Sequence, residues 1–583
     1  MKNINFIYLI LLLITMIGCH SEEPETNKAF NIKIAFEKSN GKSTSTYSEM
    51  MAFYKAADQH SDKLKISEHG ITDSGLALHV ATYSNDPKNE NDLQLLINNG
   101  IHPGEPDGID ASMLLIKDLI NGEFKLPDDV VLHIIPSYNL GGMVNRNSTS
   151  RANQNGPEAY GFRGNALNYD LNRDFIKMDT DNMRAFANIY HDLDPDVYVE
   201  THVSNGADYQ YTLTHLLTQH DRLGHQMGEY IDKTFKPQLE RSIREKDLLI
   251  TPYVNVFGRT PEEGFSQFVD SPRYSTGYTA LWNTLGLLIE THMLKPYPKR
   301  VNSTKAMLES IIELSARERD RIKSLRASNF DDFQADEYYG FDHQIDSTQY
   351  ETLDFKGYEA DTITSSITGQ PRLKYYQSRP FEKNVPYYDH LKANDSLLIP
   401  AYYVIPKAWQ RVINRLKTNQ VKMQNLKKDS LIKVESYRIA EYETSRSAYE
   451  GHYLHFDTRV NASIVEKTFS KGDLLIPTDQ KARKYLLEVL EPELKDSFFN
   501  WNFFDSILQR KEGFSPYVFE DYAVSFLEEH PGIKKDFETK KANEPAFSKD
   551  AYAQLLWIYK RTPLYEKAHL QYPIYRILPK KSG

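Results

Sequence analysis

Between residues 76 and 290 the chain alternates short apolar runs with longer segments that repeat apolar residues at helical spacing. Short apolar runs are typical of strands that are buried on both faces, whereas apolar residues three and four apart form one face of a helix. Their alternation favours an α/β sheet with helices on both faces. The predicted strands are 76–83, 93–97, 130–135, 197–200 and 285–290, and the predicted helices are 109–119, 182–191 and 220–235.

The chain has 583 residues, more than one hydrophobic core usually supports, so we expect two or three domains. The α/β pattern occupies 50–300 and follows a polar lead-in at 19–49. A long charged helix with an apolar stripe dominates 301–345, which we interpret as a helical bridge. Alternating segments, helices and aromatic clusters continue through 346–583 and predict an α+β region of unassigned role.

The N-terminus has the pattern of an export signal. A short basic start precedes the apolar run 6–17, which is too short to span a bilayer. Gly18-Cys19 then resembles the end of a lipoprotein signal peptide at 1–18, and Cys19 is the only cysteine in the chain. We therefore expect an exported protein that is lipid-anchored through Cys19 to a bacterial outer membrane or cell surface, or held in the periplasm. The alternative is a plain secretory signal with an incidental cysteine.

The charge balance argues against one class of partner. The formal net charge is -10 and the isoelectric point is about 6.0. Proteins that bind nucleic acid carry basic patches that neutralise phosphates, so we expect no nucleic-acid partner.

A histidine and a glutamate three residues apart, His102 and Glu105, follow the predicted strand 93–97. Residues at i and i+3 share one face of a helical turn, so both side chains can reach one ion. Zinc accepts imidazole nitrogen and carboxylate oxygen, and a catalytic zinc site uses three protein ligands. An isolated His-x-x-Glu pair is more often part of a solvated loop, so the surrounding sequence must decide.

The sequence His-Pro-Gly-Glu at 102–105, between a strand and a helix, resembles the metal-binding loop of the zinc carboxypeptidase family. This resemblance implies a third ligand, a histidine at a strand end about a hundred residues downstream. His202 follows the predicted strand 197–200 and meets that description. His191 and His215 are rivals, but His191 lies within a predicted helix and no predicted strand precedes His215. The implied ligands of one Zn²⁺ per chain are His102, Glu105 and His202.

The same resemblance implies groups that bind the charges of the substrate. Asn172 and Arg173 match the family's Asn-Arg pair, and a planar guanidinium can bind a carboxylate through two hydrogen bonds. The family also uses an arginine after a turn that resembles residues 136–142, to stabilise the oxyanion. Arg151 has about the right offset, while Arg146 and Arg163 are close enough to compete.

The resemblance further implies a catalytic glutamate at the end of a late buried strand, which corresponds to Glu290. A carboxylate that is buried beside a metal can take a proton from water and return it to the leaving amine. The alternative for Glu290 is an ordinary solvated strand end. Residues 272–278 resemble the family's mobile loop with a substrate-binding tyrosine, which would be Tyr274, with Tyr278 as the alternative.

The resemblance covers about residues 50–300 and implies an α/β/α sandwich with a mixed eight-stranded sheet. It implies a zinc-dependent metallocarboxypeptidase that hydrolyses peptide bonds next to a free carboxylate, with a peptide or acyl-amino acid as the substrate. Two alternatives stay open. One is a deacylase or cell-wall peptide amidohydrolase of the same fold, and the other is a surface lipoprotein that binds peptides or glycans without catalysis.

Overall fold

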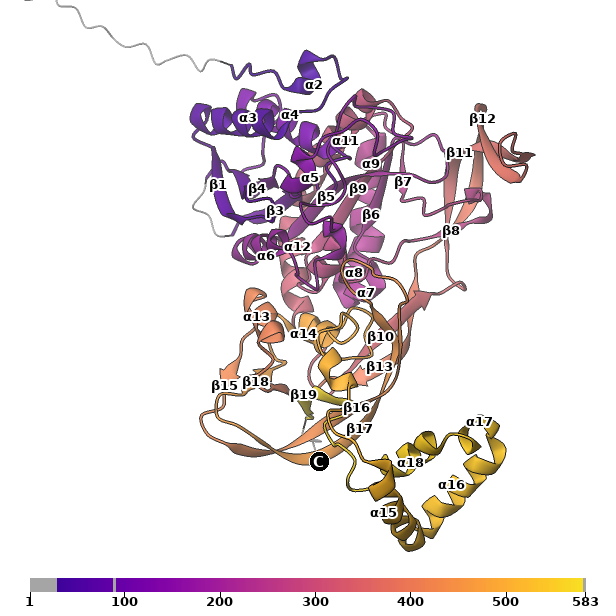
Figure 1. Cartoon of the computed structure of the whole chain (residues 1–583). Coiled ribbons are helices and arrows are strands. Elements are labelled where there is room, and N and C mark those ends of the chain that lie inside the picture. The colour runs from indigo at the N-terminus through magenta and orange to yellow at the C-terminus, as the bar shows by residue number, and fades with distance from the viewer. Residues whose placement is uncertain (1–28, 87–90, 580–583) are drawn as a thin grey trace, which may run out of the picture.

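The structure is a computed structural model that describes residues 29–86 and 91–579 (Figure 1). The predicted signal peptide at 1–18 and the predicted lipidation site Cys19 lie outside these residues. None of the helices in the described ranges combines the length and the apolar character needed to cross a membrane.

A mixed eight-stranded sheet forms the centre of the first half of the described chain, with the spatial order β1-β2-β4-β3-β5-β9-β6-β7. The central strands β4, β3, β5 and β9 run parallel, while β1 and β2 extend one side as an antiparallel pair and β6 is antiparallel to β9. This topology confirms the predicted α/β class and its mixed sheet. The strands are β1 Leu64–Ile71, β2 Ala77–Tyr83, β3 Leu93–Asn98, β4 Val130–Ile135, β5 Val197–Ser204, β6 Leu213–Leu217, β7 Ile250–Pro252 and β9 Leu285–His292.

The two faces of this sheet pack against different layers, because successive side chains of a strand point to opposite sides. Leu95 and Ile97 of β3 face a core that they share with helices α3, α4, α9 and α11, whereas Leu96 faces α6, α10 and side chains of the C-terminal half. The helices of the α/β half are α2 Ala35–Lys38, α3 Tyr47–His60, α4 Asp107–Asn121, α5 Leu140–Val144, η1 Leu171–Arg173, α6 Asp181–Leu193, α7 His220–Leu223, α8 His225–Tyr230, η2 Ile231–Phe235, α9 Lys236–Arg244, η3 Pro261–Glu263, α10 Ser275–Ala280, α11 Tyr297–Arg317 and α12 Arg319–Asn329.

The segment interpreted from sequence as a helical bridge belongs to the α/β half instead. Helix α11 places Met307, Leu308 and Ile311 in the core of the first sheet face, and α12 adds Ile322 to it. The apolar stripe that suggested a bridge is the surface that covers the sheet.

The long hairpin of strands β11 and β12 belongs to the predicted C-terminal region by sequence but packs against the first half of the chain. Strand β12 of this hairpin pairs in parallel with the two-residue strand β8. Phe355 and Val385 pack against Tyr209 and Tyr211, which follow β5. The strands are β8 Phe265–Ser266, β11 Glu351–Thr364 and β12 Pro371–Tyr388, and a separate pair is formed by β10 Tyr338–Ile345 and β13 Leu391–Leu398.

The C-terminal half is built on a six-stranded sheet with the order β15-β18-β14-β19-β16-β17. Helices α15 to α18 form a small group with its own apolar cluster, seen in yellow at the end of the chain in Figure 1. This mixture agrees with the predicted α+β character. The strands are β14 Tyr402–Ile405, β15 Gln424–Asn425, β16 Ser430–Thr444, β17 His455–Phe469, β18 Leu474–Pro477 and β19 Gln571–Ile577, and the helices are α13 Gln410–Thr418, α14 Arg483–Leu490, η4 Asp505–Leu508, α15 Pro516–Glu529, α16 Pro531–Asn543, α17 Pro545–Ser548 and α18 Ala551–Tyr559.

Candidate metal centre and active site

The three predicted metal ligands come from two neighbouring parallel strands. His102 and Glu105 lie in the turn between β3 and α4, which the hydrogen bond from Glu105 N to His102 O (2.8 Å) closes. His202 lies near the end of β5, and β3 pairs with β5 in parallel. Because parallel strands end at the same edge of a sheet, these side chains meet there.

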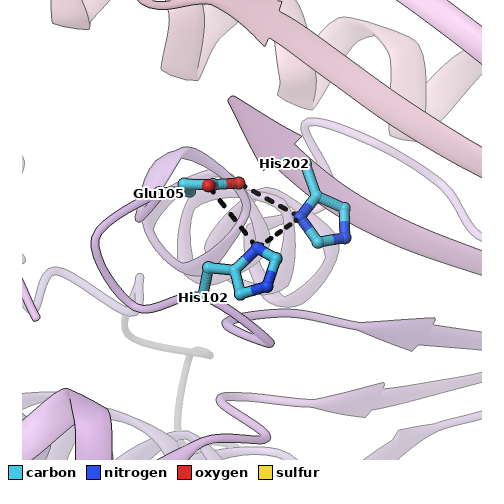
Figure 2. A group of neighbouring side chains, drawn as sticks. All are labelled: His102, Glu105 and His202. Carbon is cyan, nitrogen blue, oxygen red and sulfur yellow. Dashed lines mark hydrogen bonds and ion pairs between the residues drawn. The ribbon is translucent and has the colours of Figure 1, made fainter. Parts of the chain in front are cut away.

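The ligand atoms of this cluster face one another closely (Figure 2). His102 Nδ1 lies 3.1 Å from His202 Nδ1 and 3.5 Å from Glu105 Oε1, and His202 Nδ1 lies 3.1 Å from Glu105 Oε2. In a tetrahedral zinc site with bonds of 2.0–2.1 Å, ligand atoms are about 3.3 Å apart. All three side chains are buried. The donor set and its spacing therefore fit one zinc ion.

A carboxylate lies behind each histidine of this cluster. His102 Nε2 is 2.8 Å from Asp170 Oδ1, and His202 Nε2 is 3.4 Å from Glu200 Oε2. Such carboxylates orient a ligating imidazole and select the nitrogen that faces the ion. Glu200 ends the predicted strand 197–200 and Asp170 lies two residues before Asn172, but no local pattern marks either residue for this role.

The electrostatics of the cluster favour a bound cation. Burial opposes ionisation of Glu105, but Arg151 and His102 outweigh it and hold the pKa of Glu105 well below its usual range. Burial also opposes protonation of His202, yet Glu200 and Glu105 raise the pKa of His202 to about 10. The carboxylates that attract a proton to this ring would equally attract a metal cation, which replaces the proton on binding.

Glu290 lies beside this cluster on strand β9. The strands β5 and β9 are parallel, and their register pairs His202 with Glu290. Within the described residues, Glu290 Oε2 is buried without a hydrogen-bond partner. Burial raises the pKa of Glu290 to about 8. A carboxyl group that titrates near neutral pH beside the ligands is suited to accept and return a proton.

The arginine alternatives separate in the structure. Arg151 Nη1 donates to Glu105 Oε1 (2.6 Å), and Arg163 Nη1 lies 3.4 Å from the same oxygen and 3.3 Å from His102 Nδ1. Arg146 instead donates to backbone carbonyls, including Ala159 O (2.8 Å). The structure therefore brings Arg151 and Arg163 to the centre and assigns Arg146 a role in holding loops.

The residues that were predicted to bind the substrate carboxylate lie together near the candidate metal centre. Arg173 lies over the ring of Tyr274, with Cζ 4.4 Å from the ring centroid, and donates to Asn172 O (2.8 Å). Asn172 Oδ1 accepts from Ser275 N (3.1 Å), which ties the Asn-Arg pair to the segment that carries the tyrosine. The structure thus joins Asn172, Arg173 and Tyr274, as the sequence suggested.

Tyr278 requires a correction. Its side chain is 0% exposed in the apolar core, and its hydroxyl donates to Asn419 Oδ1 (2.6 Å). It is the aromatic residue of helix α10 and belongs to the core cluster, so it cannot contact a substrate in this arrangement. Of the two tyrosines, only Tyr274 lies beside the arginine.

The two rival histidines lie elsewhere. His191 Nε2 contacts the Tyr278 hydroxyl (3.1 Å) in the core, and His215 Nε2 contacts Glu240 Oε1 (2.8 Å). Neither belongs to the cluster of His102, Glu105 and His202.

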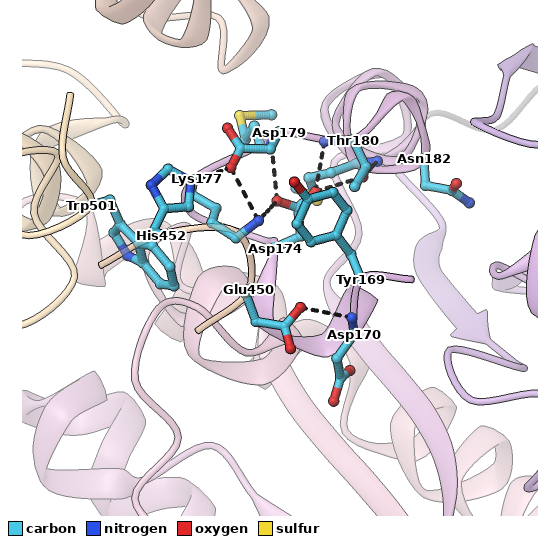
Figure 3. Close-up of polar contacts among 12 residues, drawn as sticks. Tyr169, Asp170, Asp174, Lys177, Asp179, Thr180, Asn182, Glu450, His452 and Trp501 are labelled. Carbon is cyan, nitrogen blue, oxygen red and sulfur yellow. Dashed lines mark hydrogen bonds and ion pairs between the residues drawn. The ribbon is translucent and has the colours of Figure 1, made fainter. Parts of the chain in front are cut away.

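A loop of the C-terminal half contacts the segment of the catalytic domain that contains Asp170 and Asp179 (Figure 3). Glu450, between β16 and β17, accepts from Asp170 N (2.8 Å). His452 Nε2 lies 2.6 Å from Asp179 Oδ2, which also accepts from Lys177 Nζ (3.2 Å). Asp170 is the carboxylate behind His102, so the C-terminal half reaches the residues that orient a metal ligand.

Comparison with known proteins gives a family match for part of the α/β half. Residues 50–209 match the family model of the zinc carboxypeptidases. The chain is 22% identical over 458 residues to carboxypeptidase 2 of Trichophyton rubrum, covering 74% of this chain and 78% of the relative, and the carboxypeptidase 2 of Trichophyton equinum gives the same values.

Solved structures also align with part of the chain. A metallo-carboxypeptidase from Burkholderia cenocepacia aligns with a TM-score of 0.36 and 17% identity, covering 46% of this chain and 69% of that one. A carboxypeptidase A from Helicoverpa armigera aligns with a TM-score of 0.36 and 13% identity, covering 47% and 72% of the two chains.

The family match covers His102, Glu105 and His202, the residues that form the buried cluster. It also favours an enzyme over a lipoprotein that only binds peptides or glycans. The chain is therefore a metallopeptidase with the α/β half as its catalytic domain, and its residues 50–209 are similar to the zinc carboxypeptidases.

Proposed function

We propose that this metallopeptidase binds one zinc ion through His102, Glu105 and His202 and hydrolyses the peptide bond next to a free carboxylate. The observation that supports this most directly is the arrangement at the sheet edge. Three buried ligand atoms converge there, and Glu290 stands in register with one of the ligands. Such an open three-ligand set with a nearby base is the arrangement that metal-assisted hydrolysis needs.

The chain's own residues then have distinct tasks. Zinc, when bound, would polarise the scissile carbonyl and acidify a water molecule. Glu290 accepts the proton of that water at its carboxylate and returns it to the leaving amine. Arg151 donates to the developing oxyanion, with Arg163 as the alternative, since both guanidinium groups contact Glu105.

Substrate recognition is proposed to rest on Arg173 and Asn172, with Tyr274 beside them. Within residues 29–86 and 91–579 the Arg173 guanidinium donates one hydrogen bond, to Asn172 O, so donors remain for a substrate carboxylate. The ring of Tyr274 holds the guanidinium plane from one side.

The variant Glu290→Gln tests this proposal. Glutamine keeps the size of the side chain but accepts no proton from water, so hydrolysis of a peptide with a free C-terminus should fall by about 10²–10⁴-fold. Zinc content and melting temperature should stay near those of the wild type. Glu240→Gln serves as the matched control, because Glu240 is a largely buried glutamate that pairs with His215 away from the centre. Full hydrolytic activity in Glu290→Gln would refute the role of Glu290.

We also propose that the chain is exported and lipid-anchored through Cys19. The support is the sequence alone, in which the apolar run ends directly before the single cysteine. The wild-type protein should partition with membranes in cells, and Cys19→Ser should be released from them. A mature wild-type protein that starts beyond residue 19 would leave only a secretory signal.

A further inference from the structure

A second cluster of metal-ligand side chains lies away from the catalytic centre. His220 and Asp221 belong to the short helix α7, and His390 precedes strand β13. His220 Nε2 lies 3.3 Å from His390 Nδ1 and 3.4 Å from Asp221 Oδ2, and His390 Nδ1 lies 3.6 Å from that oxygen. The rings of His220 and His390 are nearly perpendicular to each other.

These separations resemble those of the catalytic ligands. The three atom pairs at the catalytic centre are 3.1 to 3.5 Å apart, and the three pairs here are 3.3 to 3.6 Å apart. Tetrahedral coordination at 2.0–2.1 Å places ligand atoms about 3.3 Å apart. Two imidazole nitrogens and one carboxylate oxygen are also a donor set that suits zinc.

The carboxylate of this cluster is held in place by the backbone. Leu391 N donates to Asp221 Oδ2 (2.6 Å), so the first residue of β13 orients the ligand that α7 supplies. Hydrogen bonds of this kind fix ligating carboxylates in metal sites.

A buried carboxylate directly precedes His390 in the chain. Asp389 is 2% exposed and, with His220 and Asp232, forms a second group of ligand atoms that overlaps the first. Lys236 Nζ already pairs with Asp232 Oδ1 (2.7 Å) and Asp389 Oδ2 (3.2 Å). In the described chain, however, Asp389 Oδ1 is buried and has no hydrogen-bond partner. A buried carboxylate oxygen without a partner is costly unless a cation or water occupies its surroundings.

A small cavity adjoins the cluster at His220. It has a volume of about 20 Å³ and is also lined by His215, Asp232, Lys236 and Asp389, but not by Asp221 or His390. This volume is enough for one water-sized particle.

We propose that His220, Asp221 and His390 bind a second zinc ion, which has a structural role. The ion would connect helix α7 of the catalytic domain to the junction of β12 and β13, 170 residues further along the chain. Since the β11–β12 hairpin covers Tyr209 and Tyr211 beyond β5, this ion would fix the hairpin against the catalytic domain. Zinc binding at this second site is independent of the proposed peptidase mechanism.

Metal analysis of the purified full-length protein tests the second site. After dialysis against metal-free buffer, the wild type should hold two zinc ions per chain. His390→Ala and His102→Ala should each hold one, and the double variant none. His343→Ala is the matched control, because His343 lies on the neighbouring strand β10 outside the cluster, and it should keep both ions.

A second measurement covers the case in which His390→Ala folds poorly. Asp221→Asn keeps the shape of the side chain and removes the charged ligand. Adding zinc should raise the melting temperature of His102→Ala, because binding to the folded state stabilises it, but not that of His102→Ala/Asp221→Asn. One zinc per wild-type chain that is lost completely in His102→Ala would overturn the second site while leaving the proposed function intact. Two zinc ions in both His390→Ala and Asp221→Asn would overturn it as well.

Discussion

At the scale of single residues, side chains outside the proposed ligand set shape the electrostatics of the candidate centre. Asp170 and Glu200 each contact one of its histidines, and Arg151 contacts the carboxylate of Glu105. The grouping of His102 with Glu105 could be predicted from sequence because the two residues are neighbours in one motif. The contact of His102 with Asp170 joins residues that are 68 positions apart. It depends on how the intervening chain folds, so no local sequence pattern predicts it.

The two tyrosines illustrate the same limit. Tyr274 and Tyr278 are four residues apart, and the sequence offers both to the substrate. Tyr274 is the residue before helix α10, whereas Tyr278 lies within that helix and faces the core. The choice between them is set by where the helix begins and which side it buries, and both depend on tertiary packing.

Substitution of Arg173 tests the carboxylate grip. Arg173→Ala should weaken catalysis on peptides with a free C-terminus by about 2–5 kcal/mol, by analogy with truncation of a buried charge pair. C-terminally amidated peptides should lose much less, and Arg173→Lys should lie between, because lysine keeps the charge without the planar fork. The measurement is kcat/KM for matched free and amidated peptides. Equal losses on both substrates would mean that Arg173 instead holds Asp170, which lies 3.9 Å away.

At the scale of elements, most strands that are buried on both faces were predictable, but β6 and the edge strands were not. All residues of β6 are buried, yet its sequence LTHLL interrupts a short apolar run with a histidine. All residues of β4 and β5 are buried, which gives the compact apolar runs seen in the sequence. Strand β1 at the sheet edge exposes most of its residues, so its sequence LKISEHGI lacks that signal. β7 is too short, with three residues, to show any period.

One predicted helix differs from the structure for a local reason. The segment 220–235 has the apolar spacing of a continuous helix, but it is divided into α7, α8 and the π-helical turn η2. Gly224 breaks the helix with a φ of 78°, a conformation that glycine adopts without the penalty of a side chain. This break confines His220 and Asp221, two residues of the proposed second zinc site, to the four-residue helix α7.

At the scale of the whole molecule, the C-terminal half packs against one side of the catalytic domain (Figure 1). Its side chains share one apolar core with the second face of the catalytic sheet, and Trp282 of the catalytic domain stacks on Tyr485 of α14. Glu450 adds a polar contact close to the metal centre. The sequence indicated an α+β region but not this docking, because the contacts join residues that are hundreds of positions apart.

A buried lysine makes this docking sensitive to pH. Lys484 of α14 donates to Leu223 O (2.9 Å) and Asn283 Oδ1 (3.0 Å) of the catalytic domain. Burial lowers the pKa of Lys484 from 10.5 to about 7. Between these values the unfolded chain binds a proton that the folded chain does not. The free energy of unfolding therefore rises with pH in this window, by at most about 1.4 kcal/mol per pH unit. Below pH 7 both states are protonated, and the folded state bears the full cost of the buried charge.

The variant Lys484→Met tests this pH dependence. Methionine keeps most of the length of the side chain and removes the charge, so its melting temperature should exceed that of the wild type most at pH 6. The difference should shrink steadily toward pH 9, as the wild-type lysine becomes neutral in the folded state. Lys481→Met is the matched control, because Lys481 is an exposed lysine just before the same helix, paired with Asp194, and its effect should not follow this trend. A difference between Lys484→Met and wild type that stays constant from pH 6 to pH 9 would show that Lys484 keeps its proton at the interface.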